Sequence, residues 1–104
     1  MQREVLLLSV VEEQPLHGYA IIGELKRRSG GTFDLKEGTI YPALHRLERS
    51  GLLTSREVRD QGPRPRRVYR LTAKGERAIH TRTDAWQEFQ TAMGQVLDRP
   101  RWQT

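Results

Sequence analysis

Six arginines lie within residues 53–72, and the same segment holds two acidic side chains, so it carries a net charge of +4. The whole chain of 104 residues carries +5, which means that nearly all the excess positive charge is concentrated in this fifth of the sequence. A solvated surface usually mixes charges of both signs, whereas clustered guanidinium groups suit phosphate oxygens. The pattern therefore predicts a site for a polyanion, in which Arg64, Arg66 and Arg67 have few carboxylates nearby to pair with.

A second group of polar side chains lies in the segment TIYPALHRLER, residues 39–49. Ile40, Leu44 and Leu47 follow one another at spacings of four and three, which predicts a helix with one apolar face. Hydroxyl groups can bond phosphates or base edges, arginine can bond guanine through two hydrogen bonds, and proline can contact a thymine methyl group. The segment is therefore predicted to enter a DNA groove. The side chains left outside its apolar face are those of Thr39, Tyr41, Pro42, His45, Arg46 and Arg49.

Each of these assignments has a structural alternative. Tyr41 borders the apolar face and could be a core aromatic, and His45 could be an ordinary surface histidine. Arg46 and Arg49 could pair with carboxylates such as that of Glu48. Of these two arginines, Arg46 is the one that we assign to DNA.

The histidines do not indicate an enzyme. His17, His45 and His80 fall in three separate predicted helices, and none belongs to a His-Glu-x-x-His motif. The sequence also has no phosphate-binding glycine loop, no cysteine, and no serine set beside a base. We therefore expect no enzyme activity, no catalytic residue, no metal site and no cofactor. His17 is interpreted as a residue that caps or borders the helix after it.

Apolar spacing and turn residues predict the elements that hold these side chains. The apolar run within Glu4–Glu13 predicts a first helix, and the pattern from His17 predicts a second helix that stops at Gly30. The first helix is apolar around most of its circumference, so it is expected to face both its own core and another subunit. The sequence TFDL, residues 32–35, is interpreted as one very short strand.

The third helix is expected to begin between residues 36 and 40 and to end at Gly51. With Thr39 as the N-cap, Pro42 would lie in the first turn, where amide groups have no intrahelical partner and proline is tolerated. With a start nearer Lys36, Pro42 would lie deeper and imply a kink.

The segments TSREVRD and RRVYRL flank a Gly-Pro-Arg-Pro turn at residues 62–65 and predict a β-hairpin with a basic tip. From Thr72 the pattern is helical again, and Ile79, Trp86 and Met93 are spaced by seven. This last helix is expected to pack against the first one within the chain, across a dimer, or both. Trp86 could also stack on a flat ligand. The residues assigned to this dimer interface or ligand site are Leu7, Val11, Trp86, Phe89 and Met93.

The order of elements predicts an α+β fold, mainly α, of the winged helix-turn-helix type with a C-terminal dimerisation helix. The expected divisions are residues 1–72 for the DNA-binding domain, 73–98 for the dimerisation helix and 99–104 for a tail. The apolar run near the N-terminus is too short for a signal peptide, and no stretch reaches the length of a membrane span. The sequence therefore predicts a cytoplasmic protein with no membrane partner.

Three stretches of the sequence resemble the PadR family of transcriptional regulators. They are PLHGYAI at residues 15–21, GTIYPALHRLERSGLL at 38–53 and GPRPRRVYRLTAKG at 62–75. The resemblance covers about residues 3–98. The middle stretch is the most specific of the three, because a generic winged helix does not require Tyr-Pro-Ala-Leu between Gly-Thr and His-Arg-Leu-Glu.

The resemblance implies a homodimeric regulator of double-stranded DNA, a repressor in most members. It matches Trp86 to a tryptophan of the dimerisation helix that, in some members, borders a pore for flat aromatic compounds. A small aromatic effector is therefore a candidate partner, although the single short C-terminal helix resembles the compact subfamily and does not imply phenolic-acid sensing. The positions that the resemblance assigns to DNA are Thr39, Tyr41, Pro42, His45, Arg46 and the segment 62–67.

The sequence thus predicts a sequence-specific regulator, expected to act as a homodimeric repressor on a pseudo-palindromic operator and to be released by a small aromatic ligand. Two alternatives remain open. One is a winged helix that binds an acidic protein partner, and the other is a nucleic-acid binder without sequence preference that is held by the hairpin alone.

Overall fold

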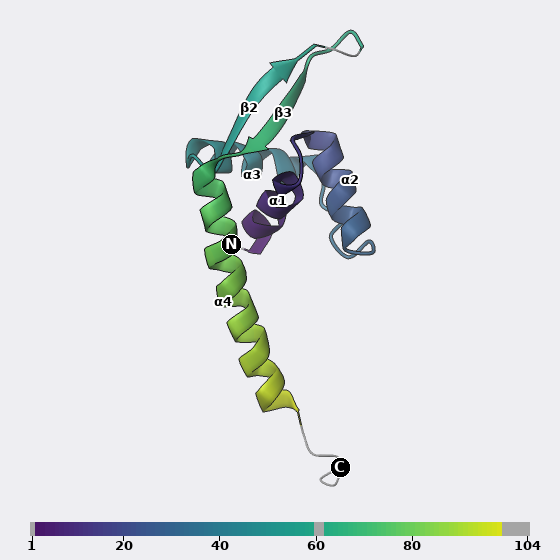
Figure 1. The fold of residues 1–104 in the computed structure, drawn as a ribbon. Helices are drawn as coiled ribbons and strands as arrows, with labels where there is room; N and C mark the ends of the chain where they lie inside the picture. Colours follow the sequence, from purple (N-terminus) through teal and green to yellow (C-terminus); the bar gives the residue numbers. More distant parts are fainter. Residues whose placement is uncertain (1, 60–61, 99–104) are drawn as a thin grey trace.

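A computed structural model describes residues 2–59 and 62–98 of the chain, and Figure 1 shows how its elements are arranged. A compact head carries the β-hairpin at one end, and a long helix leaves the head at the other (Figure 1). The molecule measures 65 × 28 × 22 Å along its principal axes. The tail expected at residues 99–104 lies outside the described residues. The helices are α1 (Gln2–Glu12), α2 (Gly18–Arg28), α3 (Glu37–Arg49) and α4 (Ala73–Leu97), and the strands are β1 (Leu16–His17), β2 (Leu53–Val58) and β3 (Arg66–Leu71).

The three strands form one antiparallel sheet in the order β1-β3-β2. The predicted hairpin is confirmed, and its register runs from Leu53 opposite Leu71 to Val58 opposite Arg66. The prediction of a strand at residues 32–35 is wrong. The third strand is instead β1, because Leu16 and His17 come directly before α2 and pair with the free edge of β3.

Helix α1 is the centre of the hydrophobic core. It packs against α2, α3, α4 and β3, so the chain itself covers most of the helix circumference. Leu7 and Val11, which the sequence assigned to a dimer interface or ligand site, are both fully buried in this core. They therefore leave almost no side-chain surface for a second subunit. The expected contact of α1 with its own core is confirmed, and its expected contact with another subunit stays a prediction.

Helix α3 begins earlier than the cap residue Thr39 would place it. Its first residue is Glu37, and Lys36 is the N-cap without a hydrogen bond from its side chain. Pro42 consequently lies inside the helix, so its missing amide proton leaves the Gly38 carbonyl without its usual intrahelical partner. Gly38 is exposed, which allows water to bond that carbonyl. The predicted end of the helix before Gly51 is confirmed.

Two predicted helix starts are confirmed by hydrogen bonds. The Ala20 amide donates to Nδ1 of His17 at 3.3 Å, which makes His17 the cap of α2. The Gly75 amide donates to the hydroxyl of Thr72 at 2.9 Å, which makes Thr72 the cap of α4. Each bond satisfies an amide that the first turn of a helix leaves unpaired.

The packed helices with their hairpin form a winged helix-turn-helix, and α4 is the expected C-terminal helix, so the predicted fold class is confirmed. Within the described residues, no helix is both long enough and apolar enough to cross a lipid bilayer.

Candidate functional site

Helix α3 divides its side chains as its apolar spacing predicts. Ile40, Leu44 and Leu47 are buried in the core, together with Ala43. The opposite face is polar, and four of its predicted site residues are open to solvent while two are half-buried. The exposed ones are Pro42, His45, Arg46 and Arg49, and the half-buried ones are Thr39 and Tyr41.

Tyr41 combines the two roles that the sequence left open, because one part of its ring is packed and another is accessible. The ring lies against Gly18 at the start of α2, where a Cβ atom would overlap the tyrosine ring and its hydroxyl. Burial raises the pKa of Tyr41, and the charge of Glu37 raises it further. The hydroxyl therefore stays protonated at neutral pH and can donate a hydrogen bond.

Tyr19 is a second tyrosine near the start of α2, and no role was predicted for it from the sequence. It is exposed on α2, and a hydrogen bond to Glu37 raises its pKa. Tyr19, Glu37 and Tyr41 therefore form one polar cluster where the N-terminal ends of α2 and α3 meet. The only sequence signal for Tyr19 was an aromatic residue on the polar side of an amphipathic helix.

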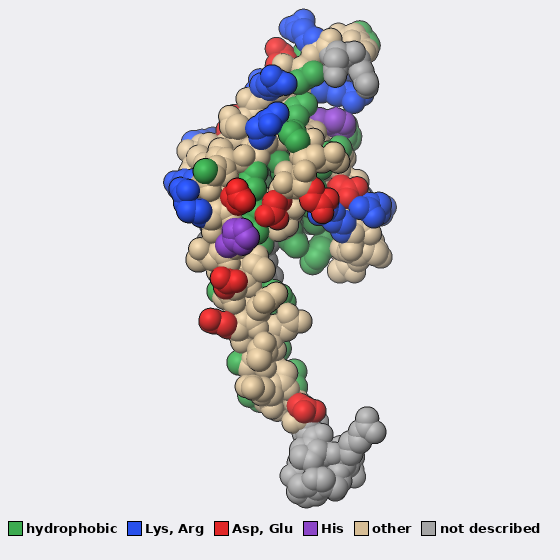
Figure 2. Space-filling view, in the orientation of Figure 1, with side chains coloured by type: hydrophobic (Ala, Val, Ile, Leu, Met, Phe, Trp, Pro, Cys, Tyr) green, Lys and Arg blue, Asp and Glu red, His purple; other side chains and the backbone are tan. Residues whose placement is uncertain are grey.

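The arginines predicted as the polyanion site lie on the hairpin. Arg64, Arg66 and Arg67 are all exposed. Figure 2 shows Lys and Arg side chains gathered over the hairpin end of the molecule, with a row of Asp and Glu side chains across the face of the head below it. The hairpin is therefore the region of this face best suited to a polyanion.

Two of these arginines point to opposite faces of the hairpin, because successive side chains of a strand alternate. Arg67 donates a hydrogen bond to the Ser55 hydroxyl at 3.0 Å, and Ser55 donates to the carboxylate of Glu48 at 2.7 Å. This chain of bonds connects β3 through β2 to α3. Arg66 lies on the other face, with a guanidinium nitrogen 3.3 Å from Nε2 of His17.

The C-terminal part of α4, residues 86–97 and here called its outer half, exposes large apolar side chains. The rings of Trp86 and Phe89 lie 5.9 Å apart and are tilted by 33°. In Figure 1 this part of α4 extends away from the head, and no other described element lies beside it. The large exposed apolar side chains of this segment are Trp86, Phe89, Met93, Val96 and Leu97.

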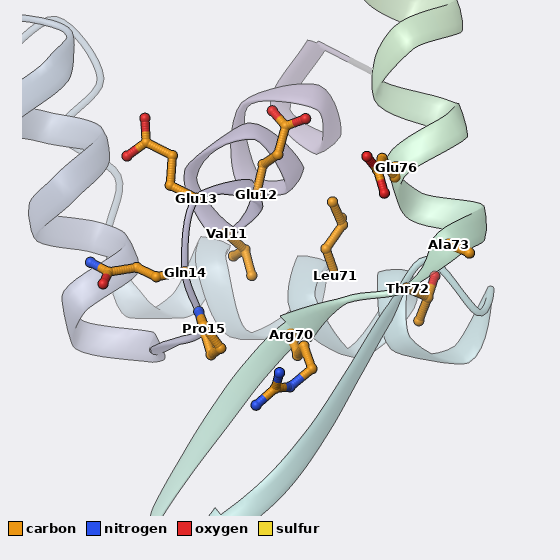
Figure 3. Close-up of a pocket in the computed structure, with 10 residues that line it drawn as sticks. All are labelled: Val11, Glu12, Glu13, Gln14, Pro15, Arg70, Leu71, Thr72, Ala73 and Glu76. Carbon is orange, nitrogen blue, oxygen red and sulfur yellow. The ribbon is translucent and has the colours of Figure 1, made fainter.

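One group of side chains was not predicted from the sequence. Glu12 of α1 lies beside Glu76 and His80 of α4, and one potential ligand atom from each lies within 4.8 Å of the others. Glu12 and Glu76 also line an open cavity of about 340 Å³ between the end of α1 and the start of α4 (Figure 3). The spacing of four between Glu76 and His80 was a signal for a shared helix face, but nothing in the sequence brought Glu12 to it.

Comparisons with known proteins agree on one family. A family model described as "Transcriptional regulator PadR-like family" matches residues 7–81. The chain is 40% identical over 81 residues to "Transcriptional regulator Rv3488" of Mycobacterium tuberculosis, which covers 75% of this chain and 72% of that protein.

Solved structures give the same result. The chain is similar to a PadR family transcription regulator from Clostridium difficile R20291, with a TM-score of 0.79 and 31% identity, covering 91% of this chain and 97% of that one. It is also similar to Bacillus subtilis PadR in complex with operator DNA, with a TM-score of 0.71 and 26% identity. That alignment covers 78% of this chain and 46% of the Bacillus chain.

Proposed function

Because the chain belongs to the PadR-like family of transcriptional regulators, which are not enzymes, we propose that it regulates transcription by binding a specific DNA sequence. In this proposal residues 1–72 are the DNA-binding domain and residues 73–98 the dimerisation helix. The observation that carries the proposal is the pairing of an exposed polar face on α3 with an exposed arginine-rich hairpin in one head. The likeness to a PadR protein in complex with operator DNA supports it.

In the proposed complex, α3 lies in the major groove. Arg46 reads a base edge, and Pro42 contacts a thymine methyl group. His45 bonds a base or phosphate from the same exposed face. Thr39 and Tyr41 lie near the N-terminal end of α3 and donate hydroxyl hydrogen bonds to phosphates. The packing of the Tyr41 ring against Gly18 suits this role, since it fixes the tyrosine hydroxyl before DNA arrives.

The hairpin supplies the contacts to the DNA backbone. Arg64 stands in the turn segment between the strands, while Arg66 and Arg67 begin β3 on opposite faces. Such contacts add affinity and salt dependence without sequence information. The hydrogen bonds from Arg67 through Ser55 to Glu48 fix the hairpin relative to α3, so the groove contacts and the backbone contacts keep a common register.

The active form in this proposal is a homodimer joined through α4. The exposed apolar side chains of α4 lie on the part that no other described element covers, and a second copy of the same helix would cover them. Two heads related by twofold symmetry would read a pseudo-palindromic operator whose half-sites are about one turn of DNA apart. We further propose that the protein acts as a cytoplasmic repressor and that a flat aromatic effector stacks on Trp86 at the interface.

The test is fluorescence anisotropy with two labelled duplexes at near-physiological salt. One duplex comes from the region upstream of the protein's own gene, and the other is a scrambled version of the same composition. We expect a preference of about a thousandfold or more for the upstream duplex. Equal binding to both would indicate a non-specific hairpin contact, and binding to neither would favour a winged helix that contacts an acidic protein.

A further inference from the structure

Three metal-ligating side chains from two helices lie together where α1 ends beside the first turns of α4. They are Glu12, Glu76 and His80, and all three are exposed. One carboxylate oxygen from each glutamate and one ring nitrogen of the histidine lie within 4.8 Å of one another. We propose that these side chains bind a divalent transition-metal ion of the Zn²⁺ type.

The backbone holds the three positions close together. Glu76 and His80 are four residues apart on α4, so their side chains project from the same helix face. Glu12 reaches them because α1 packs against α4, and both helices are anchored here by buried neighbours, Val11 on α1 and Ile79 on α4. The exposed ends of the side chains remain free to adjust around an ion.

Side-chain rotation can bring the three ligand atoms onto one ion. Ligand atoms bond Zn²⁺ at about 2.0–2.2 Å in a tetrahedral arrangement, which places two of them about 3.4 Å apart. The ligand atoms here lie within 4.8 Å of one another, so each pair has to close by about 1.4 Å at most. Three protein ligands also leave one or more coordination positions open to water. The cavity beside Glu12 and Glu76 gives that water room (Figure 3).

The mixture of donor atoms indicates the class of ion. Imidazole favours Zn²⁺ and neighbouring transition metals, whereas Mg²⁺ and Ca²⁺ prefer sites built from oxygen alone. Two carboxylates this close repel one another, and a divalent cation removes that repulsion.

Two neighbouring glutamates are already paired with arginines. Glu13 pairs with Arg28 at 2.9 Å, and Glu4 pairs with Arg82 at 3.1 Å. Among the ion pairs formed by the described residues, none involves Glu12 or Glu76. Their negative charge therefore remains available to a cation.

The proposal does not depend on the protein's binding to DNA, and it is tested with the full chain alone. Zn²⁺ is titrated into protein in chelator-free buffer by calorimetry. We expect about one ion per chain, and we expect His80→Ala and Glu12→Gln each to weaken binding by about tenfold or more. Glu88→Gln is the matched control, because it removes an exposed carboxylate from the same helix outside the cluster, and it should bind Zn²⁺ as the wild type does.

Thermal unfolding supplies a second measurement. An ion that bonds α1 to α4 stabilises the folded chain, so Zn²⁺ should raise the Tm of the wild type and of Glu88→Gln but not that of His80→Ala. In excess chelator the three proteins should unfold at the same temperature, which shows that the variants fold. Unchanged Zn²⁺ affinity in His80→Ala, or no wild-type binding at millimolar Zn²⁺, would overturn the proposal.

Discussion

The head and the outer half of α4 use apolar residues in the same sequence pattern but bury them very differently. Ile79, Trp86 and Met93 occupy equivalent positions seven residues apart, yet their exposed fractions are 5%, 50% and 44%. The change occurs where α4 passes beyond α1 and the rest of the head (Figure 1). A heptad pattern therefore predicts which side of a helix is apolar, but the neighbouring elements decide whether that side is covered.

The same comparison shows which part of the fold one chain can stabilise by itself and which part would need a second chain. The head has a core built around α1, with its polar surface outside. The outer half of α4 has only about three turns, none of its residues belongs to the hydrophobic core, and an isolated helix of that length is only marginally stable in water. Covering its apolar side chains with a second copy would stabilise this half and join two heads.

The largest effect is expected from the same substitution made in each region. Leu44 is fully buried in the head, whereas Leu97 is 68% exposed. We expect Leu44→Ala to lower the free energy of unfolding by about 2–5 kcal/mol, since it removes buried surface and leaves a cavity. In the monomer, at low protein concentration, Leu97→Ala should change it by less than about 0.5 kcal/mol, because the side chain is exposed within one chain. Urea denaturation measures both, and equal losses would contradict the division into two regions.

Gly75 lies buried in the head, in the first turn of α4. A Cβ atom there would overlap the carbonyl oxygen of Leu52 and lie 2.8 Å from Cδ1 of Leu71. We expect Gly75→Ala to destabilise the head by about 1–3 kcal/mol, because backbone must move to make room. Gly94→Ala is the matched control on the outer half of α4, where no atom lies within 4 Å. Urea denaturation measures the stability of both variants. An equal loss of stability in Gly94→Ala would show that the close contacts of Gly75 are not the cause.

Removing an aromatic ring from the outer half of α4 should weaken dimerisation and leave the stability of the head unchanged. We expect Trp86→Ala to weaken dimerisation by about 2 kcal/mol, roughly thirtyfold in dissociation constant, because a large ring would be lost from the interface. Sedimentation velocity over a concentration series measures the shift toward monomer. Circular dichroism should show a folded head throughout. A folded dimer of unchanged strength would remove Trp86 from the interface.

Two arginines of the head should have different effects on DNA binding. Arg46→Ala should cost about 1–3 kcal/mol on the specific duplex and little on a scrambled one, because it removes a base contact. Arg64→Ala should weaken both duplexes equally and reduce the slope of log affinity against log salt by about 1. Anisotropy titrations at several salt concentrations separate the two patterns. If the two variants behaved alike, α3 and the hairpin would not have distinct roles.

The smallest effect is expected at the surface of α2. Hydrogen bonds from Arg27 and Arg28 lower the pKa of Glu24 from 4.5 to about 2. A carboxyl group whose pKa is lower when folded adds stability above its unfolded pKa and loses that contribution as pH falls through the folded value. Glu24→Gln should therefore lower the urea midpoint slightly at pH 7, because the pair is exposed. The difference in urea midpoint between the variant and the wild type should shrink as the pH falls from 4.5 to 2. A difference that grew over this range would show that the hydrogen bonds of ionised Glu24 are not its cause.

The elements whose signals are local could be predicted from the sequence. Thr72 and His17 cap their helices through side chains close in sequence, and the hairpin follows from its strand-forming residues and Gly-Pro turn. The start of α3 was correctly predicted to lie within residues 36–40 but not to the residue, because its N-cap Lys36 makes no side-chain hydrogen bond. Thr39 was the more favourable N-cap by residue type, but the helix already begins at Glu37, two residues before it.

Features that depend on tertiary packing could not be predicted in the same way. The two residues of β1 are a strand only because β3 has a free edge beside them. Leu7 and Val11 were assigned to an interface since the sequence does not show how many elements surround α1. Glu12 lies more than sixty residues from Glu76 in sequence, so only the packing of α1 against α4 brings them together.

Selection from a random duplex library tests whether α3 recognises a specific DNA sequence, and it requires no knowledge of the operator. The purified protein is used to enrich bound duplexes at near-physiological salt, with Arg46→Ala selected in parallel. We expect a pseudo-palindromic motif for the wild type, with half-site centres about 10–10.5 base pairs apart, and loss of a base preference in each half-site for Arg46→Ala. A wild-type pool that stays without sequence preference after repeated rounds would contradict sequence-specific recognition by α3.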